Sequence, residues 1–493
     1  LTPAEQRLLQ ALTIFQGSFS RPAATSVAGA SLSLLSGLID KSLLRRLGPD
    51  RYSLHELIRQ YAAERLRADE PAWTEAREKH GHFYLNQLAD SEADLFSNLR
   101  GPVFEQLTAS VGDLRAAWQW GLAQQQWDLL LRAARTYPTF YELHSWNQEG
   151  LRLLIDATER LQLFTGAESA DSAVQLLFGA MLGSRGWFHF RCGQMVAART
   201  ALDEGLAHVR AARPHTERER CLQFVLFQLG MVAYVSGDYA TAQNALDEGL
   251  AISRRLSDDW GTAYTLAILG MVRLAQGQAA QAYELLSKSL ATWRRNGSPR
   301  LGVFCFSFFG IVARVTGKHE EAEAALQEGL TLAQHAGDRY GVATFLHSLG
   351  ALKLAQAAYE EAAKAVQDSL AIFTELGDRW RMTQGQTLVA AIHQAQGDLA
   401  RAEQSFRDAF ATAVDAHALP YALEALVGLA DLYAQTEQKT AAYALARRVQ
   451  NHPASSGPVQ ARAGKLVAQL AQEGVEETAV APSVAELLAR INS

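Results

Sequence analysis

The sequence predicts an all-α protein whose larger part is a right-handed solenoid of helix pairs, and three observations lead to this prediction. A pattern of small and apolar residues returns at a fixed interval of 40 residues through the second half of the chain. Alanine and leucine dominate the composition, and only 12 of 493 residues are proline, which favours helices. A period of this length indicates a repeat architecture in which each unit buries its apolar face against its neighbours.

Two registers of small residues define the repeat. The first pairs a large residue with glycine or alanine at Leu229-Gly230, Leu269-Gly270, Phe309-Gly310, Leu349-Gly350, Val389-Ala390 and Leu429-Ala430, with an earlier copy at Arg185-Gly186. The second is an alanine twelve residues later, at Ala198, Ala242, Ala282, Ala322, Ala362, Ala402 and Ala442. Between the registers lies a turn glycine at Gly193, Gly237, Gly277, Gly317 and Gly397, replaced by Ala357 and Glu437 in two copies.

The chemistry of one repeat explains this spacing. Apolar residues recur at helical intervals, stop at the turn around Gly237, and then recur again. Gly230 and Ala242 are expected where two antiparallel helices cross most closely, because a larger side chain would push the backbones apart. Gly237 can adopt a positive φ, and the carboxylate of Asp238 can cap the second helix. Each unit is therefore expected to be a helix, a tight turn and a helix.

This pattern resembles the tetratricopeptide repeat. The positions that match the signature in one copy are Leu229, Gly230, Gly237, Tyr239, Ala242 and Leu246. Tetratricopeptide units usually have about 34 residues, so longer helices and a short polar loop are expected to account for the extra length. We expect about seven such repeats within residues 169–475, followed by a flexible tail at 476–493 that carries one short helix over 483–491.

Residues 1–70 predict a separate domain of different type. Thr2 and Pro3 begin a first helix, and two further helices are expected over 20–28 and 32–44. Strand, turn and strand follow over 43–47 and 51–54, and a last helix over 55–67. Three helices and then a hairpin form the layout of a winged helix. Residues 71–168, rich in tryptophan, are expected to form a helical linker domain.

Composition and missing motifs exclude several classes of function. The net charge of -6 lacks the basic signature of a nucleic-acid coat. Cys192, Cys221 and Cys305 fit neither a disulfide framework nor a zinc site, which favours a reducing cytoplasm. No apolar run is long enough to span a membrane. The sequence holds no phosphate loop, nucleophile elbow or zinc-protease motif, so we expect no catalytic residue, no metal site and no enzyme activity in this chain.

A second resemblance covers most of the chain. The run Leu38-Ile-Asp-Lys-Ser-Leu-Leu-Arg-Arg46 and the stretch 51–66 resemble the winged helix of bacterial STAND-class signal-transduction ATPases and transcriptional regulators (the NB-ARC, AfsR-like and LuxR-type proteins). Residues 113–154 resemble the segment that joins this winged helix to the repeats, although Asp113 stands where these proteins usually have asparagine. The resemblance implies that the chain is the C-terminal part of such a regulator, with the nucleotide-binding domain upstream.

The resemblance also implies a role for His55. In that family, the histidine before the last helix of the winged helix contacts a phosphate of bound ADP. A histidine at a helix N-terminus can donate to a phosphate that the free N–H groups of the helix also attract. ADP or ATP is thus implied in the full-length protein, and no cofactor is expected in this chain. The alternative is that His55 only caps its helix or packs beside it.

The inner face of the solenoid is the candidate binding surface, because the first helix of each tetratricopeptide unit lines the concave side. The residues expected there are Trp187, Phe190, Arg191, Phe224, Phe227, Met231, Tyr234, Tyr264, Met271, Phe304, Arg314, His347 and Gln384. The first half of this set is aromatic and rich in methionine, which suits an apolar inducer or a partner helix. The alternative is that these rings fill a tightly wound superhelix or pack on the linker domain.

Three functions remain open from the sequence. The first is a regulatory sensor whose repeats bind an inducer, a peptide or a protein and whose winged helix closes the upstream nucleotide pocket, with transcription as the output and oligomerisation possible on activation. The second is a scaffold that captures a peptide or protein without switching. The third is a winged-helix DNA binder, which we do not expect because the groove-facing helix offers serines and the repelling carboxylate of Asp40.

Overall fold

The computed structural model describes residues 1–97, 101–166, 171–296, 299–436 and 438–475, and residues 486, 487 and 489 of the tail. The turn position Glu437 and six of the nine residues of the tail helix predicted over 483–491 lie outside the described residues. The chain divides into two compact units. The first comprises residues 1–144, 155–181 and 212–218, and the second comprises residues 145–154, 182–211 and 219–493.

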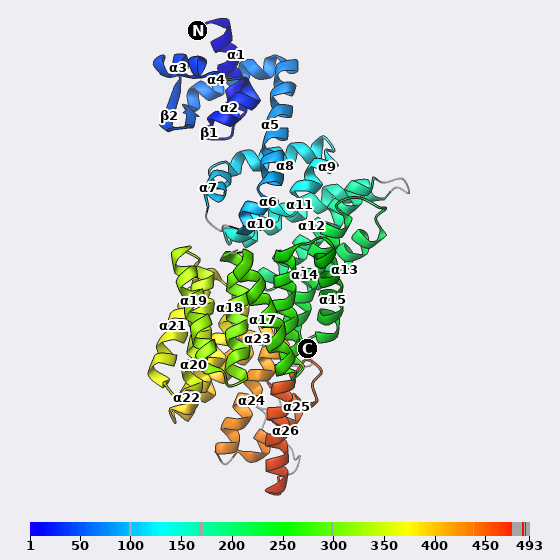
Figure 1. Ribbon diagram of the computed structural model, residues 1–493, viewed down its shortest axis with the longest axis vertical. Coiled ribbons are helices and arrows are strands. Elements are labelled where there is room, and N and C mark those ends of the chain that lie inside the picture. The colour runs from blue at the N-terminus through cyan, green and yellow to red at the C-terminus, as the bar shows by residue number, and fades with distance from the viewer. Residues whose placement is uncertain are drawn as a thin grey trace. The chain divides into compact units, whose positions relative to one another are not determined.

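The first unit begins with short helices and a small sheet (Figure 1). Its elements are α1 (Pro3–Ala11), the 3-10 helix η1 (Leu12–Ile14), β1 (Phe19–Ser20), α2 (Arg21–Ala28), α3 (Leu32–Asp40), β2 (Leu44–Gly48), β3 (Arg51–Leu54) and α4 (Glu56–Ala68). The sheet is antiparallel in the order β1-β3-β2, with Phe19 opposite Tyr52 and Leu44 opposite Leu54. The three predicted helices, the hairpin and the closing helix are confirmed as elements.

Two details of this sheet differ from the sequence prediction. Strand β1 was not predicted, because two residues are too short to show an alternating pattern. The third helix was predicted to reach Leu44, but α3 ends at Asp40. Ser42 adopts a φ of 56°, which breaks the helix, and Leu44 already pairs with Leu54 in the sheet. The helix therefore ends four residues earlier than expected, whereas β2 begins one residue after the predicted start of the strand.

Helices follow without further strands among the described residues up to the repeats. They are α5 (Glu70–Asp90), α6 (Glu92–Ser97), α7 (Pro102–Thr108), α8 (Val111–Ala123), α9 (Trp127–Ala133), α10 (Thr136–Leu143) and α11 (Asn147–Thr165). Pro102 and Pro138 both lie in the first turn of a helix, where proline removes no helical hydrogen bond. Helix α5 packs closely on α8 because Gly81 leaves room for the ring of Trp120.

A buried polar network ties the start of the chain to α5 and α8. The Asp113 carboxylate, 2% exposed, accepts a hydrogen bond from the backbone N–H of Gln16 at 2.8 Å. The same oxygen lies 2.8 Å from Nε2 of His80, which is 3% exposed. Because buried polar groups cost free energy unless they are paired, these three groups depend on one another. This contact joins residues that are 97 and 33 positions apart, which no local sequence pattern indicates.

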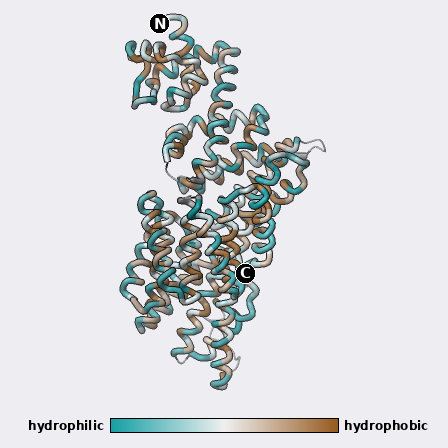
Figure 2. The backbone as a smooth tube through the Cα atoms, in the orientation of Figure 1, coloured by the Kyte–Doolittle hydropathy of each residue, from teal (hydrophilic) through white to brown (hydrophobic). Residues whose placement is uncertain are grey.

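The second half of the chain consists of paired antiparallel helices (Figure 1). They are α12 (Ser172–Arg191), α13 (Met195–Ala211), α14 (Arg218–Ser236), α15 (Tyr239–Arg255), α16 (Asp259–Ala275), α17 (Ala279–Asn296), α18 (Pro299–Val315), α19 (His319–His335), α20 (Arg339–Ala355), α21 (Tyr359–Leu376), α22 (Arg379–Ala395), α23 (Leu399–Asp415), α24 (Leu419–Gln435), α25 (Lys439–Asn451) and α26 (Gly457–Gln472). Hydrophobic residues gather where helices face one another (Figure 2). The predicted solenoid of tetratricopeptide-like helix pairs is confirmed.

The two sequence registers mark the helix crossings, as predicted. A Cβ atom at Gly230 would lie 2.5 Å from Leu246, and one at Gly270 would lie 2.6 Å from Leu286, so neither position accepts a larger residue without movement. All seven alanines of the second register are 0% exposed. The turn glycines adopt φ values between 76° and 84°, and Ala357, which replaces one of them, is held at a φ of 61°.

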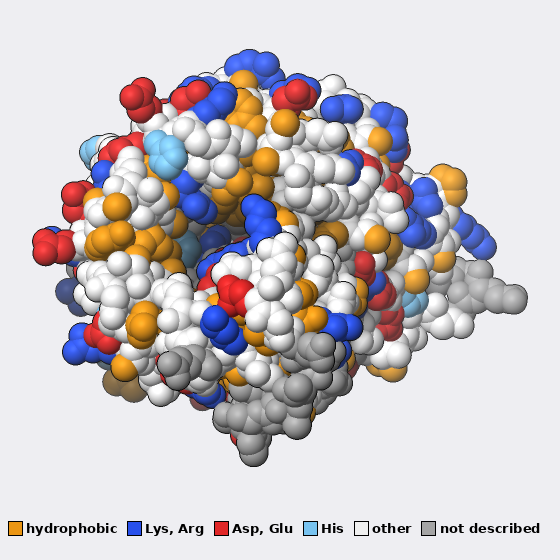
Figure 3. Space-filling model, turned by 90° about the horizontal axis from the view of Figure 1, so that it is seen from below, with side chains coloured by type: hydrophobic (Ala, Val, Ile, Leu, Met, Phe, Trp, Pro, Cys, Tyr) orange, Lys and Arg blue, Asp and Glu red, His pale blue; other side chains and the backbone are white. Residues whose placement is uncertain are grey.

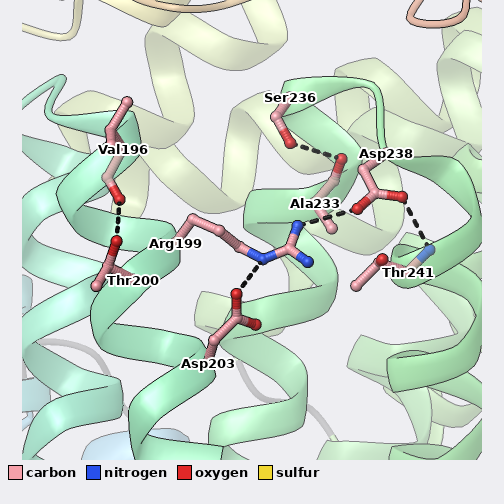
Figure 4. Close-up of polar contacts among 8 residues, drawn as sticks. All are labelled: Val196, Arg199, Thr200, Asp203, Ala233, Ser236, Asp238 and Thr241. Carbon is pink, nitrogen blue, oxygen red and sulfur yellow. Dashed lines mark hydrogen bonds and ion pairs between the residues drawn. The ribbon is translucent and has the colours of Figure 1, made fainter.

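The caps of the repeats also bind one repeat to the next. Asp238 Oδ1 accepts the backbone N–H of Thr241 at 3.1 Å, which confirms the predicted cap. Its other oxygen accepts a hydrogen bond from Arg199 of the preceding repeat at 3.0 Å, and Arg199 also donates to Asp203 at 2.7 Å (Figure 4). A capping carboxylate thus also forms an ion pair with an arginine of the neighbouring helix pair.

Candidate functional site

The inner face of the solenoid forms a cavity of about 530 Å³ that is partly open to solvent. Its walls come from the first helix of successive repeats, α14, α16, α18, α20, α22 and α24, and from α26. Apolar wall residues include Met271, Leu274, Ile311, Leu354 and Leu388. This volume lies in the range of sites for small organic ligands. The face drawn in Figure 3 is hollowed, with basic and hydrophobic side chains around the hollow.

The superhelix surrounds this cavity because its late helices return to its early ones. The Tyr239 hydroxyl donates to the backbone oxygen of Ala454, 215 positions away, at 3.4 Å. Gly457, which begins α26, lies so close to the turn at Gly277 that an added Cβ would be 2.8 Å from the Gly277 nitrogen. Tetratricopeptide helices that would otherwise line an open groove therefore surround a common axis.

The aromatic half of the predicted groove fills that axis. Trp187, Phe190, Arg191 and Met231 lie around a separate space of only about 30 Å³, too small for an organic ligand. The rings of Phe190 and Trp380 are 6.0 Å apart, and Arg191 lies over the ring of Tyr340 at 5.3 Å. These side chains pack the beginning of the solenoid against α20 and α22, which is the arrangement the sequence left as an alternative.

Three more predicted residues also lie away from the large cavity. Phe227 and Tyr264 are 3% and 7% exposed and pack with their rings 5.6 Å apart, and Tyr264 stacks on Trp260 at 5.1 Å. Phe224 is half-buried and lines neither of these two cavities. Phe304 lies in α18, but its side chain is outside the described residues. Most of the aromatic set therefore holds helices together.

Five residues of the predicted set, four polar and one apolar, do line the large cavity. They are Tyr234, Met271, Arg314, His347 and Gln384. Arg314 has a buried Nε without a hydrogen-bond partner, and within the described ranges no ion pair within 4.0 Å reaches its guanidinium. Burial lowers the pKa of Arg314, and the nearby Glu424 carboxylate opposes that shift. Arg314 is half-buried, and a partly desolvated cation that lacks a bonded partner is costly, so this position favours an anionic group in the cavity.

His347 lines the same cavity as Arg314, and the charge of Arg314 acts on its imidazole. Burial lowers the pKa of His347 to about 3, and the positive charges of Arg381 and Arg314 act in the same direction. The imidazole is therefore neutral at physiological pH, and its Nδ1 is buried without a partner among the residues described. Arg381 is itself engaged: its Nε donates to Tyr340 at 3.2 Å and another nitrogen donates to Gln384 at 3.0 Å.

Glu424 of α24 is the site residue that the sequence register missed. Its side chain is open to the cavity, which it lines opposite the helices of the middle repeats. Desolvation raises the pKa of Glu424, although Arg462 and Arg314 oppose the shift. Arg462 also lines the cavity, but it donates to the Asp431 carboxylate and is neutralised there. No sequence signal places Glu424 here, because the return of α24 to the axis creates this position.

The pKa of His347 predicts a pH dependence of stability. The unfolded chain binds a proton at this histidine near pH 6.5, whereas the folded chain does so only near pH 3. The repeat unit should therefore lose stability as the pH falls from 7 to 5, because protonation favours the unfolded state. His347→Gln should unfold with a smaller pH dependence in urea titrations at these two pH values. An unchanged dependence in the variant would assign the loss to other groups, such as His189 and His452, whose pKa values burial also lowers.

His55 lies at the N-terminus of α4 in the first unit. Its Nδ1 accepts the backbone N–H of Leu57 at 3.3 Å, so it caps the helix, and its side chain is exposed. The next turn of the same helix exposes Leu57 and Tyr61, at 70% and 62%. The imidazole is thus fixed by one nitrogen beside an apolar patch.

Two arginines of the hairpin, Arg46 and Arg51, are bonded within the protein itself, whereas Arg45 of β2 is exposed. Arg46 donates to the backbone oxygens of Gly48 and Pro49 at 2.9 and 2.7 Å. Arg51 donates to the hydroxyl and the backbone oxygen of Ser18 at 2.9 and 2.8 Å. These side chains, which could have contacted a DNA backbone, instead hold the sheet together.

The described part of the chain offers neither a metal cluster nor a single helix that could cross a membrane. No group of three or more histidine, cysteine or acidic side chains is arranged to hold a metal ion there. No single helix in those ranges is long and apolar enough to cross a membrane, and one pair, α2 with α3, reaches the required length only across a bend of 106°.

Comparisons with known proteins agree with the repeat fold. Residues 306–375 match the sequence profile of the tetratricopeptide repeat, and residues 211–278 match that of anaphase-promoting complex subunit 5. No curated protein sequence matches the chain. These matches and the stacked helix pairs define the chain as a helical tetratricopeptide-repeat protein.

Several solved structures are similar to this chain at low sequence identity. A STAND (signal transduction ATPase with numerous domains) protein with a tetratricopeptide repeat sensor from Pyrococcus horikoshii is 15% identical at a TM-score of 0.50, covering 100% of this chain and 66% of that chain. A Rap protein complexed with competence and sporulation factor is 15% identical at 0.49, covering 76% and 99%. NprR in complex with its cognate peptide NprX is 11% identical at 0.42, covering 62% and 87%.

Proposed function

We propose that this chain is the regulatory, ligand-sensing part of a STAND-type signalling regulator and that the cavity inside the repeats holds the inducer. The observation that carries the proposal is the cavity of about 530 Å³ inside the repeats, into which Arg314 and His347 present polar groups that lack bonded partners among the described residues. The fold likeness to a STAND sensor along the whole chain is consistent with this role.

The second part of the proposal concerns the first unit, read as a winged helix. We infer that α4 closes a nucleotide pocket of a preceding domain, with His55 donating to a phosphate of ADP. Two observations support this: His55 is exposed at a helix N-terminus, where free N–H groups attract phosphate, and Leu57 and Tyr61 form an apolar patch that a neighbouring domain can cover. Any hydrolysis of the nucleotide would then take place in the preceding domain, and this chain would act by binding and not by catalysis.

The mechanism would be a two-state switch. In the resting state, ADP contacts His55 and the protein is held closed. A ligand shifts this balance only if it binds the active state more tightly, and a shift from 1% to 99% active needs about a 10⁴-fold preference. A cavity that forms only when the superhelix closes provides such a preference, because its walls exist in one arrangement of the repeats.

Retention of ADP tests the proposal. The full-length protein, with the sequence that precedes Leu1, should co-purify with ADP, and His55→Ala should release it at least tenfold faster. The matched control is His335→Ala, which removes an exposed histidine on α19 of the repeats. Bound nucleotide would be quantified by chromatography after denaturation. Equal retention in all three proteins would remove the nucleotide role and leave a scaffold that binds partners without switching.

A further inference from the structure

We propose that the cavity binds a small zwitterion, an amino acid or short apolar peptide, whose carboxylate is held by Arg314 and whose ammonium group is held by Glu424. This inference rests on the ligand-sensing role proposed above and names the chemistry of that ligand. It follows from the charges that remain available on the cavity wall.

The positive charge available to a ligand is that of Arg314. Arg462 is neutralised by Asp431, and Arg381, behind the wall, is bonded to Tyr340 and Gln384. The guanidinium of Arg314 has no such partner among the described residues, so it is the group that an incoming anion would satisfy. Arginine binds carboxylates strongly because its fork of N–H donors matches the two oxygens.

The negative charge available to a ligand is that of Glu424. Arg314 and Glu424 influence one another electrostatically, yet no ion pair within 4.0 Å joins them in the described structure. They therefore face the same space from α18 and α24 with a gap between them. A pure anion would satisfy Arg314 and be repelled by Glu424, and a pure cation would do the reverse. A ligand with both charges satisfies both residues.

The rest of the wall sets the character of the ligand between its charged ends. Met271, Leu274, Ile311 and Leu388 are apolar, which favours aliphatic side chains. The neutral imidazole of His347 and the hydroxyl of Tyr421 can bond a peptide group without adding charge. An apolar amino acid and a short apolar peptide share this chemistry, and they differ in the separation of their two ends.

Isothermal titration of the whole chain with L-leucine, dileucine and trileucine tests the inference. At least one of these three compounds should bind, and the length of the one that binds most tightly would give the distance between the two charged groups of the site. Its N-acetylated form, which lacks the positive end, and its C-terminal amide, which lacks the negative end, should each bind at least tenfold more weakly, the loss of one charged hydrogen bond.

Two variants locate the two ends. Glu424→Gln should weaken the free ligand about tenfold and leave the acetylated form unchanged, whereas Arg314→Met should weaken the free ligand and leave the amide unchanged. This pairing separates a lost contact from general damage, because damage would weaken every form. Circular dichroism would confirm that both variants are folded.

Every other outcome overturns the inference in a defined way. Equal binding of the acetylated form would make the site anion-specific, equal binding of the amide would make it cation-specific, and no binding of any form would exclude this class of ligand. None of these results changes the prediction that His55→Ala releases ADP, so failure of the inference and failure of the proposed function are distinguishable.

Discussion

Gly310→Leu is expected to lower the free energy of unfolding of the repeat unit by about 3 kcal/mol or more. Gly310 lies in α18 where it crosses α19. A Cβ atom there would already be 2.5 Å from Cδ2 and 2.6 Å from Cγ of Leu326, and Leu326 is 1% exposed and cannot move into solvent without losing its contacts. Three further carbon atoms must therefore separate the two helices.

The effect should extend beyond this helix pair. In a solenoid each repeat is stabilised by its neighbours, so a weak central pair divides the array into two parts that unfold separately. Urea unfolding followed by circular dichroism should show a lower midpoint and a broader transition. Ala324→Leu is the control, because it enlarges an exposed residue on α19. It should change the free energy of unfolding by less than about 0.5 kcal/mol, the usual range of surface substitutions. Equal effects of the two changes would mean that the crossing is not tightly packed.

The repeats could be predicted from the sequence because their contacts are local. Gly230 meets Leu246 and Gly270 meets Leu286, sixteen residues apart within one helix pair, so the small residues recur with the fold itself. The caps are likewise local, as Asp238 and Thr241 show. The 40-residue period therefore predicts the helix crossings reliably, since every repeat needs a small residue at the same position.

The contacts that were missed join distant parts of the chain. Strand β1 exists because Phe19 pairs with Tyr52, and Asp113 joins Gln16 to His80 across three segments. Neither has a periodic signature. The register that identified Arg314 and His347 reports which side of a helix faces inward. It does not report how tightly the superhelix winds.

The winding decides which inward residues meet a cavity. Tight winding brings Phe190 against Trp380 and fills the first part of the axis with rings, and it brings Glu424 across from Arg314. The same inward position is therefore a packing residue in an early repeat and a cavity residue in a middle repeat. The sequence predicts the face, and the long-range closure of the solenoid determines the site.

The closure of the solenoid by α26 leads to the second prediction of a large effect. Gly457→Ala should destabilise α26 by about 2 kcal/mol, because its Cβ atom would lie 2.8 Å from the nitrogen and 3.1 Å from the Cα of Gly277 and 2.9 Å from the carbonyl carbon of Gln276. All three are backbone atoms and cannot rotate away. The start of α26 must then move off the turn between α16 and α17, and the Tyr239 contact to Ala454 should weaken with it.

Gly464→Ala provides the matched control within the same helix. Its Cβ would meet the end of the Gln450 side chain at 3.1 Å, which can move, and alanine is favoured over glycine inside a helix by about 1 kcal/mol. The two identical substitutions should therefore have opposite signs. Hydrogen exchange over 452–472 should quicken in Gly457→Ala and slow or stay unchanged in Gly464→Ala. If both variants exchange at the rate of the unmodified chain, α26 does not close the superhelix, and the cavity would have to be held together by the contacts of Arg191, Phe190 and Trp380 instead.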